Sequence, residues 1–154
     1  MRRAILYFVA VVHLVIADAV SKELAAGFLR DSAPLSVIPG FFDLAYVENR
    51  GCAWGMFQGQ VWPLAAFAVV ALALLVWKRE ALFGRGRCAA VGEALLYAGI
   101  VGNLVDRLFR GYVIDFLDFH WKAAYHFPCF NLADTFITVA AGLMILCSFG
   151  KRTS

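Results

Sequence analysis

The sequence predicts an all-α integral membrane protein with four transmembrane helices, a small extracytoplasmic β-element and an interfacial helix or loop. Of its 154 residues, 62% are hydrophobic and 16% are charged, whereas soluble domains are usually about 45–50% apolar and about 25% charged. The apolar residues also form long runs rather than alternating or amphipathic patterns, which indicates contact with lipid. The length predicts a single membrane-embedded domain over residues 1–154.

Four apolar runs are each close to the ~20 residues that a helix needs to cross a hydrocarbon core. The first span covers about 4–24, and we expect its helix to continue to about Leu29. Because no small-x-small cleavage site follows this run, we interpret it as a retained helix rather than a signal peptide. The other predicted spans are about 61–77, 89–106 and 133–149.

The distribution of basic residues predicts the orientation of these spans. With four spans, one side of the membrane carries few acidic residues and the following basic residues: Arg2, Arg3, Lys78, Arg79, Arg85, Arg87, Lys151 and Arg152. The other side mixes basic residues, Lys122 among them, with most of the Asp and Glu. The positive-inside rule therefore predicts that both termini are cytoplasmic and that residues of about 23–60 and 106–130 face outward.

The two outer segments differ in composition. Prolines and glycines interrupt the first, but residues 41–47 have the composition of a strand, which predicts a small β-structure at the membrane surface. The second is rich in aromatic residues, which favour the headgroup level of a bilayer. We expect it to lie along the interface as a short helix or loop.

The predicted topology gathers polar residues near the outer surface, among them Asp115 and Asp134. An ionisable side chain at a membrane boundary is costly and therefore indicates a functional site. Two neighbouring carboxylates can share one proton, which is the chemistry of an aspartic protease. The other members of the predicted cluster are Asp18, Lys22, Asn49, Asn103, Asp106, Arg107 and Asn131.

A purely structural interpretation explains the same residues. Asp106 and Arg107 suit a charge pair at a helix end, Asn131 suits a helix cap, and Asp134 suits the first turn of a helix. Asp18 and Lys22 lie four residues apart, a spacing at which opposite charges pair on a helix. Gly99 and Gly102 would let two helices approach closely.

Other reactive residue types carry weaker signals. His13, His120 and His126 lack metal-ligand spacing, so we predict neither a metal nor a cofactor. Ser21 and Lys22 are adjacent on a helix and would point in different directions, which disfavours a Ser-Lys dyad. The basic residues lie near the ends of apolar runs, so we predict no nucleic-acid partner.

The cysteines are scattered without a C-x-x-C motif, and we predict no disulfide framework. Cys88 and Cys147 fall at predicted cytoplasmic ends or within spans. Cys52 and Cys129 could both face outward, which leaves a bridge between them as a less favoured alternative.

Five segments, taken in order, resemble the lipoprotein signal peptidase (signal peptidase II) family. They are Asp18-Ala-Val-Ser21-Lys22, Asn49-Arg-Gly51-Cys-Ala53-Trp-Gly55, Gly102-Asn103-Leu-Val-Asp106-Arg107, Val113-Ile-Asp115-Phe116 and Phe130-Asn131-Leu-Ala133-Asp134. Each motif is weak alone, but five in order over nearly the whole chain are specific. Trp54 departs from the family, which usually has Phe there, and could reshape a loop that contacts substrate.

The resemblance implies an intramembrane aspartyl endopeptidase of the bacterial cytoplasmic (inner) membrane, with its site near the outer face. Its substrate would be a diacylglyceryl-modified prolipoprotein, cut just before the lipidated cysteine, with membrane lipid and cyclic peptide inhibitors of the globomycin type as further ligands. The catalytic dyad would be Asp115 and Asp134. Residues that bind substrate or support the dyad would be Asn49, Gly51, Asn103, Arg107, Asn131, Asp18 and Lys22.

Two alternatives belong to other classes. A non-enzymatic small membrane carrier or assembly factor would use the polar cluster to bind a headgroup or an ion. A metalloprotease would use histidine and aspartate ligands. Substitution of either dyad aspartate separates the first alternative from a protease, and insensitivity to chelators removes the second.

Overall fold

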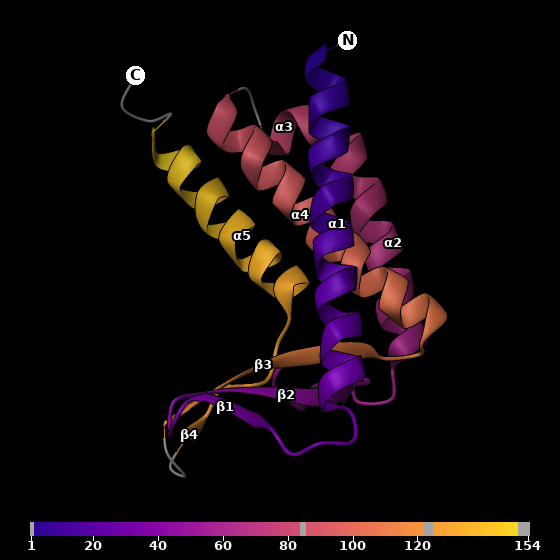
Figure 1. The fold of residues 1–154 in the computed structure, drawn as a ribbon. Helices are drawn as coiled ribbons and strands as arrows, with labels where there is room; N and C mark the ends of the chain where they lie inside the picture. The colour runs from indigo at the N-terminus through magenta and orange to yellow at the C-terminus, as the bar shows by residue number, and fades with distance from the viewer. Residues whose placement is uncertain (1, 84–85, 122–124, 151–154) are drawn as a thin grey trace.

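The computed structural model describes residues 2–83, 86–121 and 125–150, which form a bundle of helices standing on a small sheet (Figure 1). The helices are α1 (Arg2–Leu29), α2 (Val61–Trp77), α3 (Arg79–Phe83), α4 (Arg87–Phe109) and α5 (Leu132–Gly150), with a 3₁₀ turn at Ala53–Gly55. The strands are β1 (Leu35–Ile38), β2 (Phe42–Asn49), β3 (Val113–Trp121) and β4 (Tyr125–His126). Helix α1 begins, and α5 ends, at the end of the bundle opposite the sheet (Figure 1).

The helices follow the predicted apolar runs. Helix α1 continues to Leu29, and α2 covers the expected range of 61–77. By length and composition, Ile5–Leu29 and Arg87–Phe109 could each cross a membrane, while Val61–Trp77 and Leu132–Cys147 are shorter apolar helices. Of the basic residues used to predict orientation, Arg85, Lys122, Lys151 and Arg152 lie outside the described residues.

Helix α4 is central and packs against α1, α2 and α5. Gly99 and Gly102 allow the close approach of helices that was predicted for these small residues. A Cβ atom on Gly99 would lie 2.4 Å from the carbonyl oxygen of Ala133, and one on Gly102 would lie 2.5 Å from Asp18 Oδ2. Any side chain at these two positions would therefore push α4 away from its neighbours.

The sheet is antiparallel with the strand order β1-β2-β3-β4. Strand β2 confirms the strand predicted at 41–47. The segment predicted as an interfacial helix or loop instead contains β3, so that prediction was wrong. Its backbone hydrogen bonds are satisfied by β2, with Val47 opposite Asp115 and Asn49 opposite Val113. The aromatic composition suits a segment that lies along a membrane, but it does not reveal that β2 is available as a hydrogen-bonding partner for a strand.

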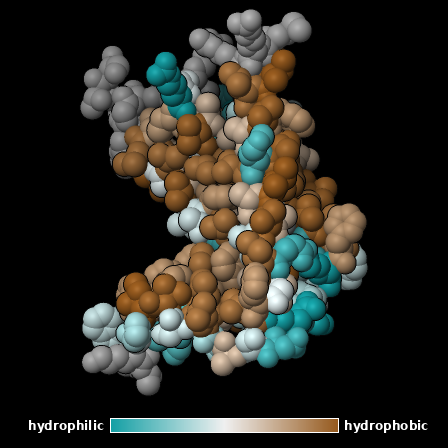
Figure 2. Space-filling view, viewed as in Figure 1, coloured by the Kyte–Doolittle hydropathy of each residue, from teal (hydrophilic) through white to brown (hydrophobic). Residues whose placement is uncertain are grey.

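Large apolar side chains cover much of the outer surface of the helices, including Phe8, Phe67 and Trp77, which are each about 70% exposed. Figure 2 shows this apolar surface on the face in view, together with a hollow between the helices and the sheet. Exposed apolar area on this scale is expected where lipid replaces water as the solvent.

Cys88 and Cys147 form a disulfide, with their Cα atoms 6.7 Å apart. We predicted no disulfide framework because Cys88 and Cys147 fall at predicted cytoplasmic ends or within spans, and this bond contradicts that prediction. The cause is the antiparallel packing of α4 and α5, which brings the start of one helix beside the end of the other. Cys52 and Cys129 are free, so the alternative bridge between them is not formed.

Candidate active site

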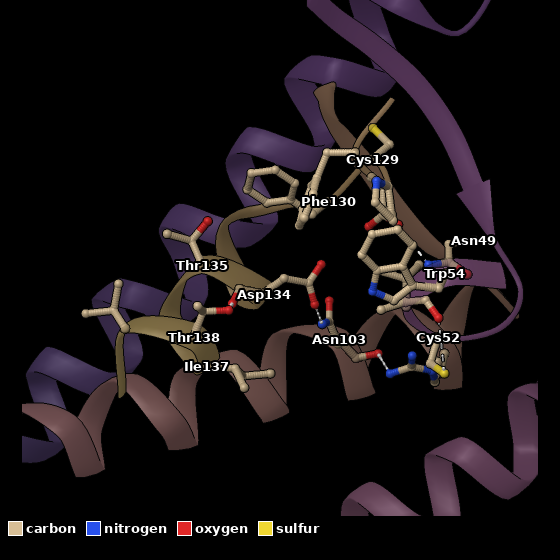
Figure 3. A pocket seen from close by; sticks show the side chains of 17 residues that line it. Asn49, Cys52, Trp54, Asn103, Cys129, Phe130, Asp134, Thr135, Ile137 and Thr138 are labelled. Carbon is tan, nitrogen blue, oxygen red and sulfur yellow. Dashed lines mark hydrogen bonds between the residues drawn. The ribbon is translucent and has the colours of Figure 1, made fainter. Parts of the chain in front are cut away.

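A cleft lies where the sheet-side ends of α4 and α5 meet the sheet and the loop that precedes α2 (Figure 3). It contains a cavity of about 430 Å³. Its polar lining comes from Asn49, Asn103, Arg107, Asp115 and Asp134, and much of its apolar lining from Trp54, Phe127, Phe130, Ile137 and Val139. A few convergent polar groups within an apolar wall are typical of a ligand-binding site.

The two aspartates are held by amide groups. Asp115, on β3, is 2% exposed and accepts hydrogen bonds from Asn49 Nδ2 at 2.8 Å and Asn131 Nδ2 at 2.6 Å. Asp134, in the first turn of α5, is partly exposed and accepts hydrogen bonds from Asn103 Nδ2 at 2.8 Å and the backbone N–H of Asn131 at 3.2 Å. These donors orient both carboxylates without supplying a formal charge.

Asn131 joins the two carboxylates. Its side-chain amide donates to Asp115, while its backbone N–H donates to Asp134. Its Oδ1 atom accepts from the backbone N–H of Asp134 at 3.0 Å, which is the helix cap predicted for this residue. The same contacts that begin α5 therefore bring Asp134 to the residue that binds Asp115.

The environment of Asp115 favours the protonated carboxyl. Burial, and next the nearby charge of Asp134, raise the pKa of Asp115 from its ordinary value of 3.8 to about 7. Hydrogen bonds from Asn49 and Asn131 act in the opposite direction but are outweighed. A carboxyl with such a pKa can exchange a proton at neutral pH.

A second set of charges lies beside the cleft and is fully paired. Lys22, 1% exposed, has its Nζ atom 2.8 Å from Asp18 Oδ2 and 3.1 Å from Asp106 Oδ2. The predicted pair of Asp18 and Lys22 is confirmed. Asp106 forms ion pairs with Lys22 and, at 2.9 Å, with Arg110. The structural interpretation had instead suggested a pair with its neighbour Arg107.

Asn103 connects the paired charges to the cleft. Its Oδ1 atom accepts hydrogen bonds from Lys22 Nζ at 3.0 Å and from Asn131 Nδ2 at 3.2 Å. Because both contacts need an acceptor, the opposite side of the amide, its NH₂ group, faces Asp134. Lys22 thus determines which atom of Asn103 meets Asp134.

The loop before α2 is fixed by several contacts. Arg107 donates to the carbonyl oxygen of Gly51 at 3.1 Å, and the backbone N–H of Gly51 donates to Asn49 Oδ1 at 2.9 Å. A Cβ atom on Gly51 would lie 2.4 Å from the carbonyl oxygen of Met56, so only glycine fits. Trp54 has a φ of 62°, a conformation that costs a non-glycine residue about 1–3 kcal/mol and clusters at functional sites.

The residues predicted for the site fall into two layers. Five line the cleft: Asn49, Asn103, Arg107, Asp115 and Asp134. Four support it through contacts that do not line the cavity: Gly51, Asn131, Asp18 and Lys22. Asp18 does so by accepting the backbone N–H of Ala133 at 2.8 Å, at the start of α5.

Sequence reasoning missed several cleft residues, including Phe127, Cys129, Thr135 and Thr138. Thr138 lies four residues after Asp134 on one helix face, a spacing that could have indicated it. Nothing in the local sequence pointed to Cys129. Within the ranges that the structure describes, no group of three or more His, Cys, Asp or Glu side chains is placed to hold a metal ion.

Solved structures with this fold define the class of protein. One, described as a bacterial membrane enzyme determined by the in meso method at 2.3 Å resolution, is similar with a TM-score of 0.80 and 30% identity, over 96% of this chain and 89% of that chain. A second of the same description, at 1.9 Å resolution, has a TM-score of 0.75 and 29% identity, over 92% and 90% of the two chains. The fold is that of a membrane enzyme.

The family follows from the sequence comparisons. The model of the family described as Signal peptidase (SPase) II matches residues 10–150. The chain is 40% identical over 148 residues to a lipoprotein signal peptidase of Ectopseudomonas mendocina, covering 93% of this chain and 87% of that protein. It is 38% identical over 141 residues to one of Symbiobacterium thermophilum, covering 92% of each.

The chain therefore belongs to the signal peptidase II family. It is a protease, and its reaction is the removal of signal peptides from prolipoproteins. The alternative of a non-enzymatic carrier or assembly factor is not supported.

Proposed function

We propose that Asp115 and Asp134 are the catalytic dyad of an aspartyl endopeptidase that acts within the membrane. The observation that carries this proposal is the role of Asn131, which hydrogen-bonds to both carboxylates at once. The two groups come from different elements, β3 and α5, and both line the same cavity. Aspartates with a purely structural role would not need to line the same cleft.

The dyad would hydrolyse the peptide without a covalent intermediate. An ionised carboxylate takes a proton from a water molecule as that water attacks the scissile carbonyl carbon. The protonated partner donates a hydrogen bond to the developing oxyanion and then transfers its proton to the leaving amine as the C–N bond breaks. Both carboxylates must therefore reach one water molecule, and together they must carry one proton.

The pair titrates as a unit, and the cleft favours Asp115 as the site of that proton. Its pKa is raised to about 7 by burial and by the charge of Asp134. Both carboxylates accept two N–H hydrogen bonds, but Asp134 is partly exposed whereas Asp115 is buried, so burial penalises a charge on Asp134 less. We therefore assign Asp115 as the general acid and Asp134 as the general base in the first step.

The substrate we propose is a diacylglyceryl-modified prolipoprotein, cut just before the lipidated cysteine. The cleft suits such a mixed ligand because polar groups at its floor meet apolar side chains of α5, such as Ile137 and Val139. The floor would bind the peptide backbone, with Asn103 and Arg107 as its nearest polar contacts outside the dyad. The apolar wall would contact the lipid and the apolar side chains of the signal peptide.

The membrane placement is also part of the proposal. Residues 1–154 would form one membrane-embedded peptidase domain, with α1, α2, α4 and α5 as four spans. Both termini would be cytoplasmic and the sheet would lie at the outer face of a bacterial cytoplasmic (inner) membrane. The excess of basic residues at the end opposite the sheet supports this orientation.

A cleavage assay in detergent tests the dyad. The substrates are a diacylglyceryl-modified prolipoprotein and its unmodified form, and the enzymes are the wild type, Asp115→Asn and Asp134→Asn. We expect each substitution to reduce turnover by about 10²–10⁴-fold while the lipidated substrate still binds. Asp118→Asn, on the same strand but outside the cleft, is the matched control and should retain turnover.

The outcomes of this assay are distinct. Cleavage that survives either dyad substitution would move the catalytic site elsewhere, with Asp106 the next candidate. Loss of activity on adding a chelator would favour the metalloprotease alternative. Equal cleavage of lipidated and unmodified substrate would contradict the proposed substrate class.

Inhibitor binding gives a second test that does not depend on turnover. A cyclic peptide of the globomycin type would place a hydroxyl group between the carboxylates, where it imitates the tetrahedral intermediate. We expect it to bind the wild type and to lose binding to Asp134→Ala when that variant remains folded. Intact binding to this variant would count against the dyad.

A further inference from the structure

Asp115 is reached by two cavities. The larger is the cleft of about 430 Å³, and the smaller has a volume of about 170 Å³. Both share the following lining residues: Asn49, Cys52, Ala53, Trp54, Asp115, Pro128 and Cys129. The buried carboxyl therefore lies at a junction between two spaces rather than at the end of one.

The two cavities differ in what surrounds them. Asp134 and the α5 side chains Ile137, Thr138 and Val139 line only the larger one. Val47 and Glu48 of β2, with Gln58 of the loop before α2, line the smaller one, which no residue of α4 or α5 lines. The larger cavity thus continues toward the transmembrane part of the bundle, and the smaller one toward the sheet.

Trp54 has the largest side chain among the residues that the two cavities share. It lines both cavities, and its ring packs edge-on against Phe127 with the centroids 5.6 Å apart. Figure 3 shows the indole standing over the cleft on the side of the loop, opposite Asp134 and Thr135. The loop that carries Trp54 is closed by backbone hydrogen bonds from Cys52 to Met56 at 2.9 Å and from Gly59 to Arg50 at 3.0 Å. These bonds hold Trp54 in the wall that the two cavities share.

A peptide that is cut at this junction needs room on both sides of the scissile bond. The signal peptide is apolar and precedes the bond, so the larger, helix-lined cavity suits it. The chain that follows the bond leaves the membrane, and the smaller cavity, with polar groups of Glu48 and Gln58 in its wall, suits that part.

We propose that the smaller cavity is the subsite for the residue that directly follows the lipidated cysteine, and that its size selects an extended peptide with a small side chain there. This inference rests on the proposed function. The smaller cavity has a volume of only about 170 Å³, so a glycine, alanine or serine would fit beside Val47, whereas an indole would have to displace lining residues. Val47 faces the junction because it is the β2 residue paired with Asp115.

The test varies one substrate position. Three diacylglyceryl-modified substrates carry Ser, Leu or Trp immediately after the lipidated cysteine and are otherwise identical. For the wild type we expect kcat/KM to fall by about tenfold or more from Ser to Trp, with Leu between them. Wild-type cleavage of all three at one rate would overturn the subsite and leave the proposed function intact. Cleavage of none of them would instead contradict the proposed function.

Two matched variants locate the selectivity. Val47→Ala enlarges the smaller cavity, and Val139→Ala enlarges only the larger one; the two valines are 40% and 47% exposed, so neither truncation should unfold the protein. We expect Val47→Ala to narrow the Ser-to-Trp ratio by about threefold or more and Val139→Ala to leave it unchanged. An equal change in both variants, or a change in Val139→Ala alone, would overturn the proposal.

Discussion

Two pairs of aspartates lie near each other in this fold, and they differ in the groups that contact their carboxylates. Asp18 and Asp106 share the buried ammonium group of Lys22. Asp115 and Asp134 are held by side-chain and backbone amides. The first two carboxylates each have a cation within 3.1 Å, whereas the direct partners of the other two are neutral donors. The first arrangement suits a support and the second suits proton transfer.

The two groups are nevertheless connected. Lys22 donates to Asn103, and Asn103 donates to Asp134. Asp18 accepts the backbone N–H of Ala133, at the start of the helix that carries Asp134. The paired charges therefore orient the proposed catalytic groups, and separating stability from activity requires substitutions on each side of this connection.

The largest effect on stability should come from Lys22→Met. Removal of the ammonium group leaves Asp18 buried without a cation, while Asp106 keeps Arg110. Breaking one partner of a buried ion pair typically costs about 3–5 kcal/mol, which thermal unfolding in detergent would detect. The double variant Lys22→Met/Asp18→Asn should recover part of this loss because it removes the uncompensated charge. If Lys22→Met is as stable as the wild type, the cluster is not a support.

Asp115→Asn should stabilise the folded protein at high pH, in contrast to Lys22→Met. The folded protein binds a proton at Asp115 up to about pH 7, whereas the unfolded chain releases it near its ordinary pKa of 3.8. Wild-type stability should therefore fall as the pH rises from about 4 to 7, by at most about 4 kcal/mol. Asparagine cannot ionise, so this pH-dependent loss is absent. However, its NH₂ group would face an N–H donor of Asn49 or Asn131, and the lost hydrogen bond would cost about 1 kcal/mol of stability.

The net expectation is a variant about 2 kcal/mol more stable than the wild type at pH 8 and no more stable at pH 4. Unfolding temperatures measured across this range provide the check. Parallel curves for wild type and variant would mean that Asp115 ionises at its ordinary pKa. Catalytic groups are often destabilising in this manner, because the site is arranged for reaction rather than for stability.

The same division explains what the sequence could predict. Local signals were reliable: the apolar run of 61–77 became α2, the four-residue spacing of Asp18 and Lys22 became an ion pair, and the position of Asn131 before an apolar run became a helix cap. Each of these depends on residues within one turn or one helix.

Contacts between distant segments were not predictable in the same way. Strand β3 depends on β2, more than sixty residues earlier, and only the alternation of apolar and polar residues over Leu117–Trp121 hinted at it. Asp106 pairs with Lys22 from another helix, and Cys88 bonds to Cys147 across 59 residues. Which aspartates pair with a cation and which are held by amide groups is likewise a property of the tertiary structure.

Gly102→Ala should reduce stability less than Lys22→Met, through a clash with Asp18 of the same ion-paired cluster. The added Cβ would lie 2.5 Å from Asp18 Oδ2 and 3.2 Å from the Cβ of Ala133, so the carboxylate or α5 must shift. Overpacking typically costs about 1–3 kcal/mol, and the gain of about 1 kcal/mol for alanine over glycine in a helix offsets part of it. We expect a net loss of about 1 kcal/mol in the free energy of unfolding.

Gly92→Ala is the matched control for this substitution. It lies on the same helix and is also buried, but its nearest neighbour would be 3.5 Å away, at Leu143 Cβ. The helix propensity gain should then appear alone, as a stabilisation of up to about 1 kcal/mol. Equal effects of the two substitutions would show that the space beside Asp18 does not limit the packing of α4.

The smallest effect should come from an ion pair that is exposed. Arg50 and Glu48 are 3.2 Å apart, but their side chains are 59% and 36% exposed. The hydrogen bond from Arg50 lowers the pKa of Glu48, so any stabilisation is present above the ordinary pKa of 4.5 and is lost as the pH falls. Exposed pairs contribute about 0–1 kcal/mol and weaken with salt. Glu48→Gln should therefore change the unfolding temperature far less than Lys22→Met, and a comparable loss would mean that burial does not distinguish the two ion pairs.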